Sequence, residues 1–121
     1  FSKEEARRLA ATEFRTAPHP IADALCGSGD LAKPSSYIAE TLRPVLFELF
    51  RCQDFESTLV GVVNRGGDSD TAGALAGALA GALYGHSGIP ARWSDAVQGA
   101  RELAVLAEDL LRAADSDRRK G

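Results

Sequence analysis

Four glycines at intervals of four residues constrain the fold of this chain more than any other feature of its sequence. Gly73, Gly77, Gly81 and Gly85 lie in the stretch TAGALAGALAGALYG, residues 71–85. A glycine inside a helix costs about 1 kcal/mol relative to alanine, so we expect a neighbouring backbone to approach this face closely and offset the cost. As a helix the stretch would span only about 22 Å, which is too short to cross a bilayer. The spacing therefore predicts the central helix of a helical bundle.

Apolar residues at helical spacing predict a second core-facing helix that begins near Tyr37. Its expected apolar face carries Ile38, Leu42, Val45, Leu46, Leu49 and Phe50. Pro44 has no amide proton, which predicts either a kink or a helix that starts nearer to Pro44. Asp54 is the expected N-cap of the next helix. The apolar positions of that helix are Phe55, Leu59, Val62 and Val63.

The two ends of the chain also have helical patterns. We expect a helix over Lys3–Ala17, a short helix over Ile21–Cys26 and a loop over Gly27–Ser36, which is rich in glycine, proline and serine. Near the other end, Ser94 is the expected N-cap of an amphipathic helix. Its expected inward positions are Val97, Leu103, Leu106, Leu110 and Leu111. No stretch has the alternating pattern of a strand, so the predicted fold class is all-α.

Composition and charge argue against several classes of partner. A formal net charge of -3 gives no electrostatic reason to expect nucleic acid. No apolar run approaches the ~20 residues of a membrane span, and the opening FSKEEARR lacks the apolar core of a signal peptide. Cys26 and Cys52 have no metal-binding spacing and are interpreted as buried thiols in a reducing compartment. We therefore expect a cytoplasmic protein without a nucleic-acid or membrane partner.

The octapeptide NRGGDSDT, directly before the glycine-rich helix, has the composition of a ligand site. Asp68, Asp70 and Thr71 bring three hard oxygen donors together, which suits magnesium, manganese or calcium. Gly66 and Gly67 permit backbone angles closed to other residues, so nearby amides can point at a phosphate. The alternative is that Asp70 caps the helix and Asp68 supports the turn.

A longer stretch around this turn resembles a known family. NRGGDSDT, the AGALAGALAGALYG that follows it and the later IPARW closely resemble the C-terminal signature of the ADP-ribosylglycohydrolase family. The similarity extends upstream to SYIAETL and DFE, so that it covers roughly Ser36–Asp95. Members of that family are all-α enzymes that remove ADP-ribose from modified side chains with two magnesium or manganese ions. The resemblance implies the C-terminal part of the family's orthogonal helical bundle.

The resemblance also implies roles for individual residues. Asp68, Asp70 and Thr71 match the C-terminal half of a binuclear metal site, with Asp68 and Asp70 as the catalytic pair. The positions expected on the ADP-ribose side are Gly66, Gly67, Ser69 and Tyr37. Tyr37 either contacts the nucleotide or anchors the core through its ring. The sequence does not choose among modified arginine, modified serine and ADP-ribose polymer as substrate.

The family's remaining metal ligands come from an N-terminal segment with a threonine and two aspartates, and from an acid further upstream. No Thr-Asp-Asp string occurs here, and the chain begins at Phe1 and contains no methionine. We therefore expect residues 1–121 to be a single helical unit and the C-terminal fragment of a larger domain, or one piece of a split chain. Its expected partners are the N-terminal half of the same enzyme and an ADP-ribosylated protein or ADP-ribose.

Two other functions fit the same residues. The chain could be a non-catalytic remnant or interaction module in which the acidic turn is only a helix cap, as in an inactive lens crystallin related to the family. It could also be a helical adaptor that dimerises through the glycine stripe. Low solvent exposure of Gly77 and Gly81 would exclude the adaptor.

Overall fold

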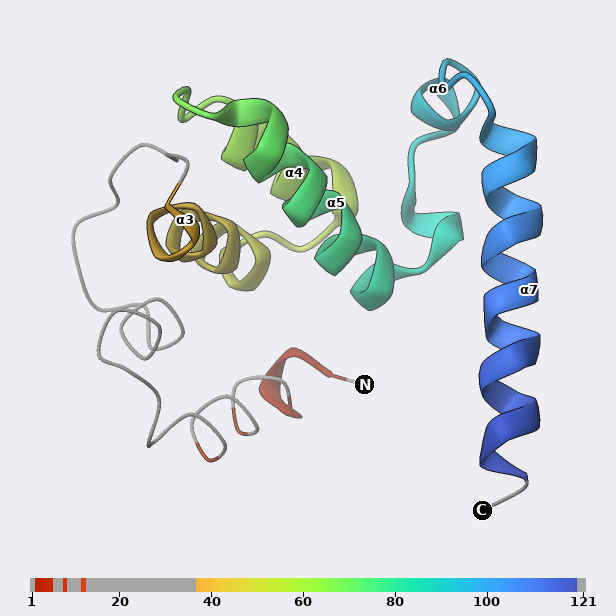
Figure 1. The fold of residues 1–121 in the computed structure, drawn as a ribbon. Coiled ribbons are helices and arrows are strands. Elements are labelled where there is room, and N and C mark those ends of the chain that lie inside the picture. The colour runs from red at the N-terminus through yellow and green to blue at the C-terminus, as the bar shows by residue number, and fades with distance from the viewer. Residues whose placement is uncertain (1, 6–7, 9–11, 13–36, 120–121) are drawn as a thin grey trace. The chain divides into compact units, whose positions relative to one another are not determined.

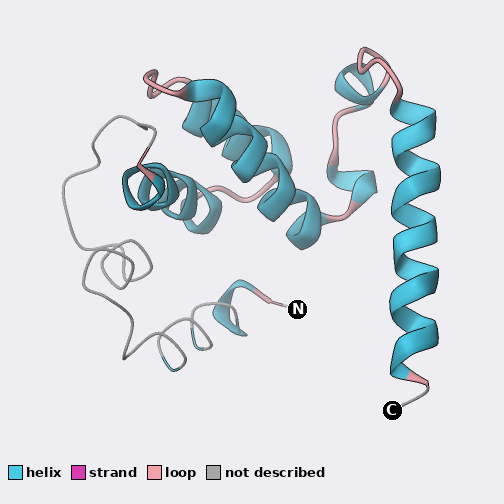
Figure 2. Cartoon of the chain, in the orientation of Figure 1, coloured by secondary structure: helices cyan, strands magenta, loops and turns pink. Residues whose placement is uncertain are grey.

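A computed structural model describes residues 2–5, 8, 12 and 37–119 of the chain (Figure 1). The part described is helical with connecting loops and contains no strand, which confirms the all-α prediction (Figure 2). Its elements from residue 37 onward are α3 Ile38–Arg51, α4 Phe55–Val63, α5 Ser69–Tyr84, η1 His86–Gly88, α6 Ala91–Ser94 and α7 Ala100–Arg118. None of the described helices is long and apolar enough to cross a membrane.

The chain groups into two compact units, Phe1–Ile89 and Pro90–Gly121. Whether both belong to one domain stays a prediction. The helix expected over Lys3–Ala17 is described only at a few positions, which are helical at residues 3–5, 8 and 12. The short helix expected over Ile21–Cys26 and the loop expected over Gly27–Ser36 lie outside the described residues.

Helix α3 begins at Ile38, so Pro44 lies inside it and the alternative of a later start is wrong. Val45, Leu46 and Leu49 are buried as predicted, and Leu42 and Phe50 are half-buried. Ile38 was expected in the core but is 59% exposed. It is the first residue of the helix, and the buried face passes through Thr41 at that end instead.

Helix α4 is capped as predicted, because Oδ1 of Asp54 accepts a hydrogen bond from the amide of Ser57 at 2.7 Å. Phe55 and Val62 are buried, whereas Val63 is exposed, contrary to the prediction. Val63 is the last residue of α4, where the helix ends and the chain turns toward α5. The hydrogen bond from the Ser57 amide lowers the pKa of Asp54 below its ordinary value.

Helix α5 packs against both α3 and α4, which confirms its prediction as the central helix (Figure 1). Its buried stripe consists of Ala72, Ala76 and Ala80, each 0% exposed, and not of the glycines next to them. The small alanine side chains allow the two neighbouring helices to pack close to the axis of α5.

The prediction that a neighbouring backbone approaches the glycine face is wrong for the described residues. A Cβ placed on Gly73 would meet a side-chain carbon of Val63 at 3.4 Å, and one on Gly81 would meet the Phe55 ring at 4.0 Å. Above Gly77, no atom of the described chain lies within 4 Å of such a Cβ. Gly77 and Gly81 are half-buried, so the burial that would exclude a dimerising adaptor is not observed.

The core between these three helices holds the start of α5 in place. Its fully buried members are Val45, Val62, Ala72 and Ala76, and Leu59, Leu75 and Leu79 pack against them. Ala72 lies one turn after Asp68, and its amide donates to the Asp68 carbonyl at 3.1 Å. Packing of Ala72 therefore fixes the helix end that carries the acidic turn. At the opposite end α5 stops at Gly85, which has a positive φ of 74°.

In the second unit, the last helix does not begin after Ser94 as the sequence predicted. Helix α7 begins at Ala100 after Gly99, which has a φ of 76°. Ser94 does not cap it, because Ser94 ends α6 and its hydroxyl donates to the Ala91 carbonyl at 3.0 Å.

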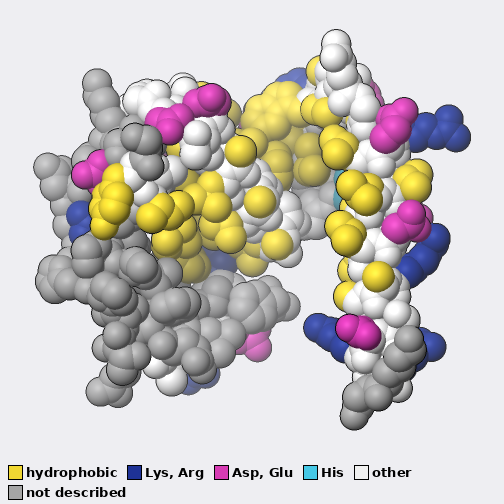
Figure 3. All heavy atoms as spheres, viewed as in Figure 1, with side chains coloured by type: hydrophobic (Ala, Val, Ile, Leu, Met, Phe, Trp, Pro, Cys, Tyr) yellow, Lys and Arg dark blue, Asp and Glu magenta, His cyan; other side chains and the backbone are white. Residues whose placement is uncertain are grey.

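The apolar positions expected to face inward from the last helix are exposed, so that prediction is wrong (Figure 3). They are Val97, Leu103, Leu106, Leu110 and Leu111. Within the described part of this unit, the other helix is α6, whose 4 residues are too few to cover the 19 residues of α7.

Candidate metal centre

The acidic turn is built at the junction of α4 and α5. As α4 ends, the amide of Arg65 donates to the Val62 carbonyl at 3.2 Å and that of Gly66 to the Val63 carbonyl at 3.1 Å. The chain then turns through Gly66 and Gly67, whose φ angles are 71° and 74°. A side chain would strain the backbone at such angles, which confirms the predicted need for two glycines.

The next residues start α5 and bring the predicted donors together. Asp68 occupies the N-cap position and is half-buried, as is Ser69, whereas Asp70 and Thr71 are exposed. The Ser69 amide donates to the Gly67 carbonyl at 2.8 Å, which tightens the turn. All six predicted site residues from 66 to 71 thus lie in one turn at the N-terminal end of α5.

The carboxyl groups of Asp68 and Asp70 converge. A hydrogen-bonding contact with Asp68 holds the pKa of Asp70 below its ordinary value, and the amides of Asp70 and Thr71 lower it further. Two carboxyl groups this close together can act as oxygen ligands of one cation. The arrangement therefore suits a bound divalent ion.

The capping alternative stays a prediction, because the amides of Asp70 and Thr71 hydrogen-bond to the Asp70 carboxylate at the start of the helix. The N-cap residue is Asp68 and not Asp70, and the Asp68 side chain makes no capping hydrogen bond. Asp70 is the second residue of the helix. Hydrogen bonds from its own amide and from the Thr71 amide lower the pKa of Asp70 and hold its carboxylate at the start of the helix.

The donors present suit a hard divalent cation, because carboxylate and hydroxyl oxygens are the ligands that magnesium and manganese prefer. Asp68 and Asp70 would hold such an ion, with the Thr71 hydroxyl next to them on the first turn. Across the described ranges, no group of three or more His, Cys, Asp or Glu side chains could hold a metal ion. That this turn supplies half of a larger ligand set stays a prediction.

Tyr37 lies apart from the turn in sequence, at the N-cap of α3. Its carbonyl accepts hydrogen bonds from the amides of Glu40 and Thr41 at 3.0 and 3.1 Å. The residue is 56% exposed, so the alternative that its ring anchors the core is wrong. Contact between Tyr37 and a nucleotide stays a prediction.

A buried ionic cluster that the sequence did not predict lies beside the turn, centred on Glu48 of α3, which is 3% exposed. One carboxylate oxygen, Oε1, accepts hydrogen bonds from Nε of Arg65 at 3.1 Å and from its Nη2. The other, Oε2, accepts from Nε and Nη2 of Arg51 at 2.9 and 2.5 Å. Burial opposes ionisation of Glu48, but the hydrogen bonds from Arg65 and Arg51 outweigh it and lower its pKa.

Gly61 of α4 makes room for this cluster. A Cβ at Gly61 would lie 2.7 Å from Oε2 of Glu48. Two signals in the sequence pointed to the cluster: a glutamate on the buried face of α3, and a glycine in the interior of α4. Cys52, the C-cap of α3, is a buried free thiol as predicted, whereas Cys26 lies outside the described residues.

The sequence pattern of the ADP-ribosylglycohydrolases matches residues 2–120. The chain belongs to the ADP-ribosylglycohydrolase family. It is 44% identical over 85 residues to the ADP-ribosyl-[dinitrogen reductase] glycohydrolase of Rhodospirillum rubrum, a match that covers 69% of this chain and 29% of that protein. It is 32% identical over 83 residues to the ADP-ribosylarginine hydrolase Tri1 of Pseudomonas putida (strain GB-1), with 69% and 22% covered.

A third ADP-ribosylglycohydrolase relative is the ADP-ribosylhydrolase ARH3 of Bos taurus, 44% identical over 57 residues, which covers 47% of this chain and 16% of that protein. The chain thus spans less than a third of the length of each of these three relatives. No solved structure matches it significantly. The predicted family is confirmed.

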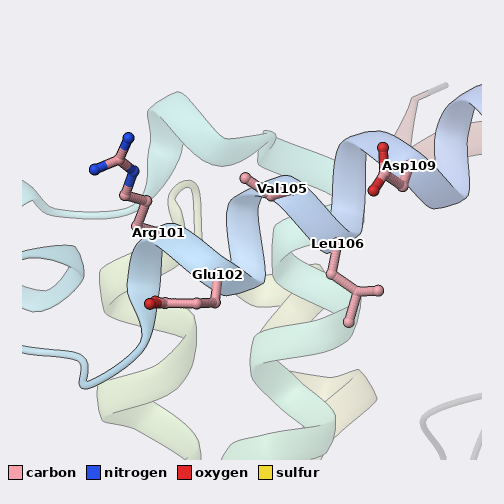
Figure 4. A pocket seen from close by; sticks show the side chains of 5 residues that line it. All are labelled: Arg101, Glu102, Val105, Leu106 and Asp109. Atoms are coloured by element: carbon pink, nitrogen blue, oxygen red, sulfur yellow. The ribbon is translucent and has the colours of Figure 1, made fainter.

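A shallow hollow on this ADP-ribosylglycohydrolase chain lies away from the acidic turn in sequence. Its lining residues are Arg101, Glu102, Val105, Leu106 and Asp109 (Figure 4). All of them belong to α7, and none was predicted as a site residue.

Proposed function

We propose that this chain contributes the acidic turn of a metal-dependent ADP-ribosyl hydrolase, which removes ADP-ribose from a modified protein side chain. The contact between Asp68 and Asp70 at the start of α5 carries the proposal. The three relatives are named as ADP-ribosyl hydrolases, which supports the same type of reaction here. In this proposal the remaining ligands come from the N-terminal half of the same enzyme, and the protein acts in the cytoplasm.

The proposed reaction is hydrolysis at the anomeric carbon of the ribose. The bond between that carbon and the side-chain atom breaks, a water oxygen forms a new bond to the carbon, and the released side chain takes up a proton. Two magnesium or manganese ions, when bound, would supply Lewis-acid stabilisation and a template for the ribose hydroxyls. Asp68, Asp70 and Thr71 would hold that part of the site.

The glycines and Ser69 would form the substrate side of the turn. Because Gly66 and Gly67 have no side chains, a ligand can approach their backbone closely. The partial positive charge of a helix N-terminus favours an anion, which suits the pyrophosphate of ADP-ribose. Tyr37 at the start of α3 is the proposed nucleotide contact.

Replacement of Asp70 tests the proposal directly. In the protein at its full natural length, D70A should abolish the metal-dependent release of ADP-ribose from an ADP-ribosylated arginine substrate. The matched control is D117A, which removes an exposed acid of α7 and should leave release unchanged. Unaltered turnover in D70A contradicts the assignment.

The competing function is a non-catalytic remnant. It predicts no manganese binding by the full-length protein in calorimetry, whereas the hydrolase predicts binding that is lost in D70A.

A further inference from the structure

We propose that Glu48 and Arg65 are a positioning pair that fixes the acidic turn for metal binding. The inference rests on the proposed function, because it concerns the same metal site. Neither side chain is offered as a metal ligand. Their proposed action is through the backbone that carries Asp68.

The contact between the two residues joins α3 to the residue immediately before the double glycine. Arg65 directs both Nε and Nη2 to one oxygen of a carboxylate that is almost fully buried. Its guanidinium also lies 5.3 Å from the centre of the Phe47 ring, which holds it from a second direction. A planar guanidinium that makes two hydrogen bonds and lies against an aromatic ring has little freedom to shift.

A turn with two consecutive glycines needs such an anchor. A Cβ placed on Gly66 would meet no described atom within 4 Å, so local packing does not fix the conformation of this residue. Glycine has more accessible backbone conformations than any other residue and loses the most entropy when ordered. The buried Ala72 holds the turn from the α5 side, and the ion pair of Arg65 with Glu48 holds it from the α4 side.

Arg51 provides an internal comparison. It binds the other oxygen of Glu48 with the same two guanidinium nitrogens, but it is the last residue of α3 and its side chain is 57% exposed. Loss of Arg51 would weaken the cluster without releasing the glycine turn. A role confined to stability should change the melting temperature in both variants and leave manganese binding by the folded protein unchanged, whereas a positioning role should weaken binding when Arg65 is lost.

The test is manganese titration of the full-length protein by calorimetry, together with kcat and KM for ADP-ribose release and with the melting temperature. R65M should weaken manganese binding by about 10- to 100-fold, the usual effect of losing a group that orients a metal ligand. R51M should bind within about twofold of wild type, since its side chain does not reach the turn. R65K keeps the charge and one donor, so it should recover part of the loss.

The outcomes separate the two proposals. Weak binding in R65M with near-normal binding in R51M supports the positioning pair. Equal binding in R65M and wild type overturns it and leaves the proposed metal site intact. Absence of binding in wild type itself overturns both proposals. If R65M does not fold, R65K decides: binding equal to that of wild type overturns the pair, and measurably weaker binding in folded protein supports it.

Discussion

Two clusters of acids and arginines in this chain have the same chemistry and different surroundings. In the α3–α4–α5 unit, the Glu48 carboxylate is 3% exposed and binds Arg51 and Arg65. On α7, Arg112 is 74% exposed and binds Glu108 and Asp109 at 3.2 and 3.4 Å. The first cluster joins α3 to the turn after α4, and the second joins neighbours on one helix.

The difference shows where charge determines structure. A buried carboxylate that loses its partner is left without water, so the cost of breaking the contact is high. An exposed pair exchanges its contact for water at almost no cost. The first cluster can therefore fix the backbone position of Arg65, whereas the second contributes little beyond a charged helix face.

The largest expected effect comes from E48Q, which keeps the shape of the side chain and removes its charge. It should lower the free energy of unfolding by about 3 kcal/mol, at the low end for a broken buried pair because both arginines retain access to water. E108Q on α7 should change it by less than about 0.5 kcal/mol. Urea unfolding of both full-length variants measures the difference, and equal losses would remove the distinction between the clusters.

Overpacking should give the next largest difference between the regions. A76L places a large side chain at a fully buried position of α5 and should destabilise the protein by about 2 kcal/mol. A107L makes the same change at an exposed position of α7 and should be close to neutral. Thermal unfolding of the pair checks the prediction, and a neutral A76L would mean that the alanine stripe is loosely packed.

Two glycine-to-alanine substitutions should have opposite signs. G61A directs a methyl group at the anchored Glu48 carboxylate and should destabilise by about 1 kcal/mol. G77A meets no described atom and should stabilise α5 by about 0.7 kcal/mol, because alanine has less backbone entropy to lose. Urea unfolding gives the sign of each. Destabilisation by G77A would reveal a partner on the glycine face.

The smallest expected effect is a change in acid sensitivity. The folded-state pKa of Glu48 is lowered from its ordinary 4.5, so its contribution is complete above about pH 4.5 and is lost as pH falls through the lower folded value. E48Q should remove this part of the acid dependence, whereas E108Q should retain it. Unfolding curves between pH 2 and 6 compare the slopes, and identical slopes for wild type and E48Q contradict the prediction.

Local patterns predicted much of the fold. The Asp54 cap and the positive φ angles of Gly66 and Gly67 depend on residues close together in the chain, so the sequence was sufficient to predict them. The closeness of Asp68 and Asp70 was equally predictable, because the two residues stand at the start of the helix that begins at Ser69.

Features that depend on packing between helices were not predictable in the same way. The glycine spacing predicted that the glycine face of α5 is the packed one, but the packed face is that of the buried alanines, which have the same period and lie one position away. The periodicity of α7 predicted a buried face, but periodicity does not reveal whether a neighbour covers it. The Glu48–Arg65 contact joins α3 to the turn after α4, across 17 positions of the chain, which local spacing does not show.

The most direct test of the central claim is manganese titration of the full-length protein with D68N, with D70N and with both substitutions. Two carboxylates that hold one ion act as a unit, so either single variant should lose about as much affinity as the double variant. D117A should bind as wild type does. The account predicts this non-additive loss, and wild-type manganese affinity in both single variants would contradict it.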